Sequence, residues 1–283
     1  MLAKRFFGRI GLPPPTALRR LFSGNAALAE AATVPRFLAP LYTGSTKPPV
    51  TVVLDLDETL VKTFELDDES AEPTRGKPNL HSEIFFGMGD IVHYCTYFRP
   101  GLLEFLRELR TLDNCEVMVY TLGVQQYVDE VINAIDGEKG KAGALFRHRL
   151  YSQHGLPCPL AKRQKDMRVL NRDLSRVISI DDSVYSYLRQ PDNSIPVPAY
   201  KGPNTRPVTT EKEIFSFVLD EVFKAAKEDD VRPYLQKRFG LRSALEKDST
   251  LRRYMRSAEV LNLHTVPSVM EGGKRAPPVS ILQ

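Results

Sequence analysis

The chain has 283 residues and a formal net charge of +4, and 42% of its residues are hydrophobic while 26% are charged. This composition is typical of a globular protein with a packed core, and it excludes a fibrous or fully disordered chain. The length allows one domain with extensions, because single cores rarely grow beyond about 300 residues.

The basic excess is concentrated at the N-terminus. Residues 1–29 hold no acidic residue and five basic ones: Lys4, Arg5, Arg9, Arg19 and Arg20. An arginine-rich, acid-poor start is typical of a mitochondrial presequence, and the run at 20–23 (RLFS) resembles a matrix-peptidase cleavage site. We therefore expect a mitochondrial protein, in the matrix; the alternative is a basic disordered tail. No apolar run approaches the roughly 20 residues that cross a bilayer, so we expect no membrane span.

Proline and glycine mark a linker at 37–49, before the first strong strand signal. We expect a targeting segment and linker at 1–46, a folded domain at 47–240, and a basic, partly helical to disordered tail at 241–283. Residues 231–257 hold eight Lys or Arg and two acids. We interpret them as a solvated surface helix; the alternative is docking onto RNA or an acidic partner.

Because the cysteines and histidines are scattered, we expect reduced thiols and no zinc or histidine metal site.

Strand and helix signals alternate through the folded part. Apolar runs without polar alternation, as in strands buried on both faces, lie at 49–54, 115–120 and 177–180. Amphipathic helices are expected at 102–111, 127–135 and 214–226, a short strand at 150–151, and a loop at 65–79 followed by a hairpin of strands 83–86 and 91–98. This order predicts an α/β fold: a doubly wound parallel sheet with a small β-hairpin insertion. In such a fold we expect ligands to bind at the carboxyl ends of the strands of the parallel sheet.

Two carboxylates, Asp55 and Asp57, follow the first buried strand. Where the chain turns at the end of a strand, both can converge on one small volume. Paired carboxylates favour a hard cation such as Mg²⁺, which takes oxygen ligands and commonly completes its shell with substrate phosphate. In phosphoryl transfer Asp55 would attack, Mg²⁺ and Lys165 would neutralise charge, and Asp57 is the candidate acid/base.

Four segments, in order, resemble the motifs of the haloacid dehalogenase superfamily. Residues 52–61 (VVLDLDETLV) are similar to its first motif, in the form found in phosphatases of the RNA polymerase II carboxy-terminal domain and in the related receptor subunit of the mitochondrial inner-membrane translocase. Residues 119–121 (VYT), the Lys165 region and residues 177–183 (VISIDDS) resemble the second, third and fourth motifs. The resemblance implies a haloacid dehalogenase-like, Rossmannoid fold.

The resemblance also implies roles for particular residues. It makes Asp55 the nucleophile and a metal ligand, and Asp57 the acid/base, which lends its backbone carbonyl to the metal. It implies that Thr121 and Lys165 bind phosphate and that Asp182 is the third metal ligand. The supporting residues would be Thr59, which holds the loop of the first motif, and Asp181, which orients the lysine.

Two functions remain open at this point. The first is a Mg²⁺-dependent phosphatase that acts on a phosphorylated protein or a small phosphomonoester through an aspartyl-phosphate. The second is a catalytically silent interaction or structural subunit of a large mitochondrial assembly, either the ribosome or the protein-import translocase. In that case the basic termini would contact RNA or the complex.

Overall fold

The computed structural model describes residues 34–41, 47–66, 76–86, 90–137, 145–158 and 161–263. The predicted presequence, most of the predicted loop at 65–79 and the last twenty residues lie outside these ranges. Their predicted properties are therefore still predictions.

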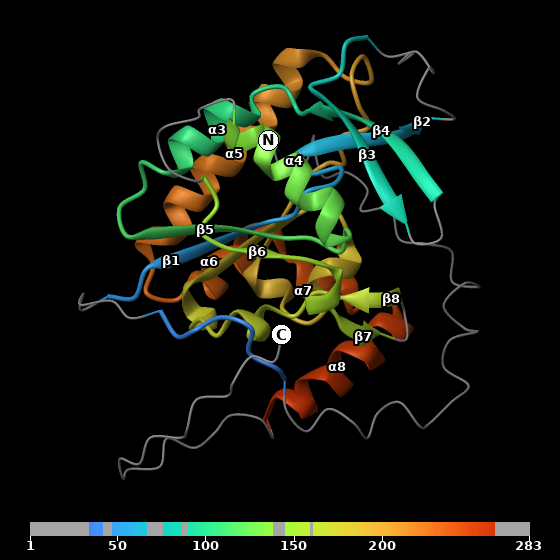
Figure 1. Ribbon diagram of the computed structural model, residues 1–283. Coiled ribbons are helices and arrows are strands. Elements are labelled where there is room, and N and C mark those ends of the chain that lie inside the picture. Colours follow the sequence, from blue (N-terminus) through green and yellow to red (C-terminus); the bar gives the residue numbers. More distant parts are fainter. Residues whose placement is uncertain are drawn as a thin grey trace.

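A five-stranded sheet forms the centre of the molecule (Figure 1). Its strand order is β10-β9-β1-β5-β6, and all neighbouring pairs are parallel. The strands are β1 (Val50–Leu54), β5 (Cys115–Tyr120), β6 (Arg149–Leu150), β9 (Val177–Asp181) and β10 (Ser194–Pro196). Every residue of β1 and β9 is buried, as expected for strands covered on both faces. The predicted parallel α/β sheet is confirmed.

Three helices cover one face of this sheet: α3 (Leu102–Leu109), α4 (Gln125–Gly137) and α5 (Val208–Lys227). Their apolar side chains share one core cluster with alternate residues of the strands, among them Val52 and Val119. Figure 1 shows the three helices together above the sheet. Helices α4 and α5 extend beyond the ranges predicted from their apolar stripes, because their ends are polar.

The opposite face is covered by shorter pieces of chain. Two 3₁₀ turns, Met167–Leu170 and Leu174–Arg176, pack there with Val34 and Leu38 against Val53. Residues 34–41 are therefore attached to the domain, although the sequence placed them in a targeting segment and linker.

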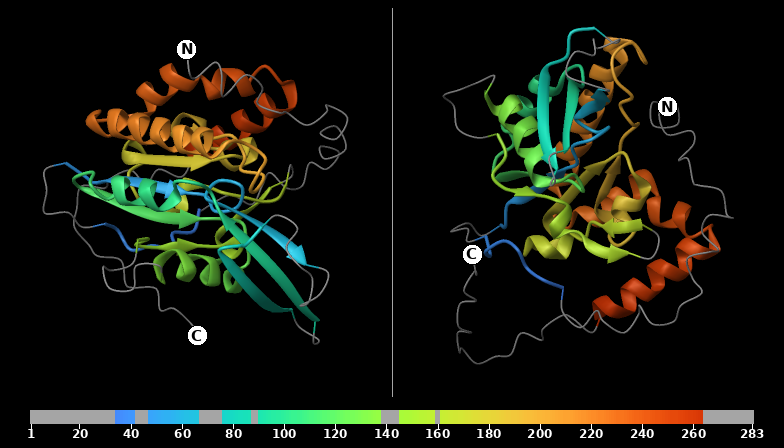
Figure 2. Two further views of the ribbon diagram at one scale, coloured as in Figure 1. Left: turned by 90° about the horizontal axis from the view of Figure 1, so that it is seen from above. Right: turned by 45° about the vertical axis from the view of Figure 1, so that its right-hand side comes forward.

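A second, antiparallel sheet stands beside the first and has the order β2-β4-β3. It comprises β2 (Val61–Leu66), β3 (Leu80–Phe86) and β4 (Asp90–Phe98). Strands β3 and β4 are the predicted hairpin, whereas no strand was predicted at β2. Figure 2 shows this sheet projecting from the central sheet at the end where α4 lies.

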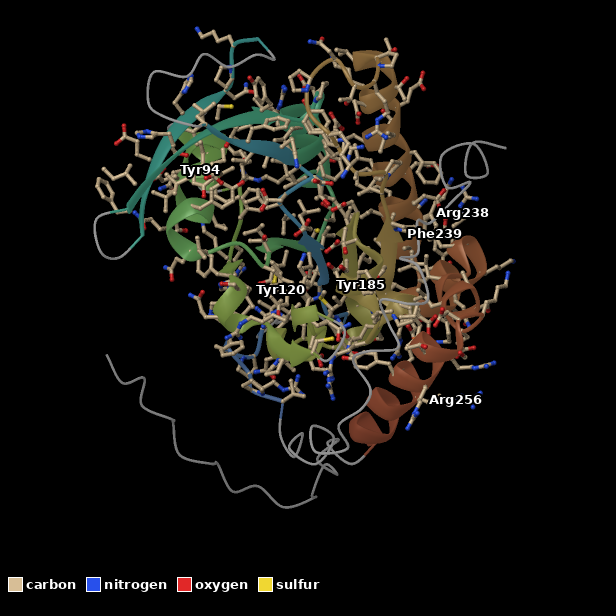
Figure 3. All side chains as sticks on the ribbon, turned by 90° about the vertical axis from the view of Figure 1, so that its right-hand side faces the viewer. Tyr94, Tyr120, Tyr185, Arg238, Phe239 and Arg256 are labelled. Atoms are coloured by element: carbon tan, nitrogen blue, oxygen red, sulfur yellow. The ribbon has the colours of Figure 1, made fainter. Side chains whose placement is uncertain are left out.

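The C-terminal helices α6 (Val231–Phe239), α7 (Leu241–Leu245) and α8 (Ser249–Leu263) continue from the domain (Figure 3). Leu241, Leu245 and Leu251 are buried in a cluster with Leu188, so the folded core continues past residue 240, where we expected a tail to begin. The basic residues of this region, such as Arg252 and Arg256, are exposed, as expected for a surface helix. Within the described ranges, no helix has the length and apolar character needed to cross a membrane.

Candidate active site

The carboxyl ends of three neighbouring parallel strands place the predicted site residues at one edge of the central sheet. Asp55 directly follows β1, Thr121 follows β5, and Asp181 is the last residue of β9. The backbone N–H of Asp55 donates to the carbonyl of Ile180 at 3.0 Å, which fixes the start of the loop beside the end of β9. Ligands of open α/β sheets bind at this edge.

Lys165 lies just beyond the short strand β8 (Ala161–Gln164) and is 2% exposed. Its Nζ donates to Asp55 Oδ1 at 2.5 Å and to Asp181 Oδ2 at 2.6 Å. Burial alone would lower the pKa of this ammonium, but the carboxylates of Asp181 and Asp55 raise it above its usual value. The lysine is therefore charged and oriented at the oxygen of the predicted nucleophile.

Thr59 ties the loop after β1 to the end of β9. Its hydroxyl is 3.2 Å from both Asp55 Oδ2 and Asp182 Oδ1, and it accepts the backbone N–H of Asp182 at 3.1 Å. The Thr59 hydroxyl has one proton, and this proton is shared between the carboxylates of Asp55 and Asp182. This arrangement brings one oxygen of Asp55 and one of Asp182 around the same point.

A magnesium ion fits these residues. Asp55, Asp181 and Asp182 each offer a carboxylate oxygen, and these atoms lie within 4.8 Å of one another. Both oxygens of Asp181 accept a hydrogen bond, from Lys165 and from the N–H of Ser183. Within the described part of the chain, Oδ2 of Asp55 and Oδ1 of Asp182 share only the proton of Thr59, so these two oxygens are the natural ligands. Burial, and then the charge of Asp55, raise the pKa of Asp182 to about 7, so a cation would relieve an unfavourable concentration of negative charge.

Asp57 lies two residues further along and is held by a partner that the sequence analysis missed. The hydroxyl of Tyr127, on α4, donates to Asp57 Oδ1 at 2.5 Å. Burial raises the pKa of Asp57 to about 6, and the tyrosine hydrogen bond opposes that shift. The only signal in the sequence is that Tyr127 opens the apolar stripe of a helix, and a buried tyrosine needs a partner for its hydroxyl.

The backbone between Asp57 and Thr59 takes an uncommon conformation. Glu58 has a φ of 60°, in the left-handed region that side chains other than glycine disfavour. Several contacts hold it there: Tyr200 N–H donates to the Glu58 carbonyl at 2.6 Å, and the ammonium groups of Lys62 and Lys201 bind its carboxylate. Such over-determined outliers are concentrated at functional sites.

A buried arginine supports the same loop from behind. Arg99 donates to the Thr59 carbonyl at 3.0 Å, to the Pro198 carbonyl at 2.9 Å and to Glu211 of α5 at 2.7 Å. The loop is thereby fixed to a helix of the main core.

Thr121 is 2% exposed and accepts the N–H of Gly123 at 3.1 Å through its hydroxyl oxygen. No described residue accepts the proton of this hydroxyl, so a ligand can accept it. Phosphate binding by Thr121, and metal binding by the Asp57 carbonyl, are still predictions.

Known proteins match much of this chain. The chain is 31% identical over 192 residues to human carboxy-terminal domain RNA polymerase II polypeptide A small phosphatase 1, covering 67% of this chain and 66% of the relative. It is 31% identical over 216 residues to CTD small phosphatase-like protein 2 of Dictyostelium discoideum, covering 76% and 34%. The chain thus spans from one third to two thirds of the length of these relatives.

Among solved structures, the fission yeast RNA polymerase II CTD phosphatase Fcp1 is similar at 21% identity, with a TM-score of 0.43 and coverage of 76% of this chain and 62% of the other. The family described as NLI interacting factor-like phosphatase matches residues 50–232, which hold the central sheet, the antiparallel sheet β2-β4-β3 and every predicted site residue. The predicted resemblance is therefore confirmed: the chain belongs to the NLI interacting factor-like phosphatase family.

Proposed function

We propose that the chain is a Mg²⁺-dependent phosphatase that uses Asp55 as its nucleophile. One observation carries this proposal: the buried Lys165 ammonium contacts Asp55 Oδ1, while Thr59 holds Asp55 Oδ2 next to Asp182. A carboxylate flanked by a fixed ammonium and a candidate metal ligand is arranged for attack on a phosphate, whose negative oxygens need such charges.

The reaction has two steps. An oxygen of Asp55 forms a bond to phosphorus as the ester P–O bond breaks, and Asp57 gives its proton to the leaving oxygen. Water then attacks phosphorus, its proton passes to Asp57, and the bond to Asp55 breaks to release phosphate. Lys165 binds the phosphate oxygens in both steps. Asp55 and Asp182 would hold Mg²⁺, which would supply further positive charge at the site.

For the substrate we propose a phosphorylated protein or a small phosphomonoester. The named activity of the human relative, a phosphatase of the RNA polymerase II carboxy-terminal domain, supports the phosphoprotein class. We further propose a location in the mitochondrial matrix, from the basic presequence pattern of residues 1–29. A matrix protein would act on phosphoproteins other than nuclear RNA polymerase.

The test is hydrolysis of an aryl phosphate by the purified chain, with and without Mg²⁺. We expect metal-dependent turnover that Asp55→Asn abolishes and Asp220→Asn leaves unchanged, because Asp220 is an exposed aspartate on α5 that pairs with Lys224. If aryl, alkyl and peptide phosphates all stay intact in the presence of Mg²⁺, the chain is not a phosphatase.

A second function is favoured by the exposed basic residues near the C-terminus: Lys247, Arg252, Arg253 and Arg256. A catalytically silent subunit of a large mitochondrial assembly, the ribosome or the import translocase, would use them to bind RNA or an acidic surface. Salt-sensitive co-sedimentation with a large particle would support this function, and a monomer in mitochondrial lysate would exclude it.

A further inference from the structure

A line of three hydroxyl groups connects the small antiparallel sheet to Asp57. Tyr127 OH is 2.5 Å from Asp57 Oδ1 and 2.7 Å from Thr63 Oγ1, on β2. Thr63 Oγ1 is in turn 2.8 Å from Thr96 Oγ1, on β4. The tyrosine is 8% exposed, and the ring of Tyr94 packs beside it with 5.9 Å between ring centroids. Figure 3 shows Tyr94 between the strands of this sheet and α4.

The direction of these hydrogen bonds follows from counting protons. Each hydroxyl has one proton to donate. Tyr127 gives its proton to Asp57, so its oxygen must accept the proton of Thr63, whose oxygen then accepts from Thr96. Hydrogen bonds aligned in this way polarise and strengthen one another.

Tyr127 has one proton to donate, and it donates that proton to Oδ1 of Asp57 at 2.5 Å. Among the described residues, none makes a hydrogen bond with Asp57 Oδ2.

We infer that Tyr127, oriented by Thr63, is a positioning residue that makes Oδ2 of Asp57 the proton-carrying oxygen in the reaction. In a carboxylic acid the carbonyl oxygen is the better hydrogen-bond acceptor, so a fixed donor at Oδ1 favours Oδ1 as the carbonyl oxygen and places the proton on Oδ2. In the first step, this Oδ2 proton passes to the leaving oxygen as the P–O bond breaks. In the second step, Oδ2 takes the proton of the attacking water.

This inference rests on the proposed function, and a series of leaving groups tests it. A para-nitrophenolate leaves readily without a proton, whereas phenolate and the alkoxide of a phosphoserine peptide need one. For Tyr127→Phe we expect kcat/KM to fall by less than about threefold with para-nitrophenyl phosphate. With phenyl phosphate and the phosphoserine peptide we expect a loss on the order of 10-fold or more, a part of the 10²- to 10⁴-fold that acid/base catalysis typically contributes.

Two further variants sharpen the test. Thr63→Val keeps the shape of the side chain but removes the proton that orients Tyr127, so it should show the same dependence on the leaving group with a smaller amplitude. It also provides a result if Tyr127→Phe fails to fold. Tyr94→Phe removes a hydroxyl from the neighbouring ring, outside the hydroxyl line, and should leave the whole series unchanged.

A loss of equal size with every leaving group, or no loss, would overturn the inference, because a merely structural role does not depend on the leaving group. Failure of the proposed function has a different result: the wild-type chain would hydrolyse none of the substrates. A wild type that turns over all three phosphates while Tyr127→Phe and Thr63→Val follow it in parallel would refute the positioning role alone.

Discussion

Replacing Lys165 with methionine should destabilise the protein strongly. The Lys165 side chain is 2% exposed, and the side chains of its partners Asp55 and Asp181 are 10% and 1% exposed. Methionine retains most of the packing of the lysine stem but leaves two buried carboxylates without a counter-charge. Removing one partner of a buried ion pair typically costs about 3–5 kcal/mol, and we expect the free energy of unfolding to fall by that amount.

The assay is urea unfolding in the presence of a chelator, at about pH 8 and about pH 5, with the slope m checked for constancy. The matched control is Lys224→Met, which breaks an exposed pair with Asp220 and should cost about 0–1 kcal/mol.

The pH dependence follows from Asp181. Burial raises its pKa to about 6 even with the ammonium present, and removing the ammonium raises it further. A carboxyl with a raised folded-state pKa binds a proton that the unfolded chain does not. The loss of unfolding free energy in Lys165→Met is therefore fully present above the folded-state pKa of Asp181. This loss shrinks as the pH falls through that pKa. A midpoint shift no larger than that of Lys224→Met, or one that grows towards low pH, would show that Lys165 does not neutralise the two buried carboxylates.

Other predictions test the metal site, the acid/base and the C-terminal helices. Mg²⁺ should raise the thermal midpoint of the wild type, and Asp182→Asn should remove most of that increase; an equal increase in both would exclude Asp182 as a ligand. Because burial raises the pKa of Asp57 to about 6, and the acid form donates the proton, kcat/KM with phenyl phosphate should fall as the pH rises through about 6; a flat profile would contradict this role. Leu251→Ala should lower the free energy of unfolding by about 2–5 kcal/mol in urea titrations, because Leu251 is fully buried; a loss below about 1 kcal/mol would show that α8 is dispensable.

The central sheet was predictable from the sequence because its signals are local. The strands Val50–Leu54 and Cys115–Tyr120 are short apolar runs, and their ends are marked by polar residues of the site. In a parallel sheet these ends meet at one edge, so their proximity follows from topology. The resemblance to family motifs added Lys165, whose place in the site no local pattern reveals.

The features that were missed depend on distant contacts. Strand β2 (VKTFEL) mixes polar and apolar residues without regular alternation, and its pairing with β4 decides its structure. Tyr127 was assigned to the apolar stripe of a helix, and its hydroxyl partner, Asp57, is 70 residues away. Residues 34–41 are held by side chains such as Asn171, which donates to the carbonyl of Leu38, 133 residues away.

The C-terminal region shows how composition can obscure a core. Its many lysines and arginines favoured a solvated tail, but Leu241, Leu245 and Leu251 lie between the basic residues and pack on Leu188. Long basic side chains on the exposed face of a helix are compatible with an apolar face beneath. The spacing of the hydrophobic residues indicates the packing of this region better than its net charge does.

The role of Asp55 as nucleophile is tested by locating the phosphoryl group on the enzyme. The chain, turning over a phosphomonoester in Mg²⁺, would be quenched in acid and digested, and its peptides examined by mass spectrometry. We expect a phosphorylated peptide with the modification on Asp55, absent from Asp55→Asn. A phosphoryl group on another residue, or turnover that survives in Asp55→Asn, would rule out Asp55 as the nucleophile.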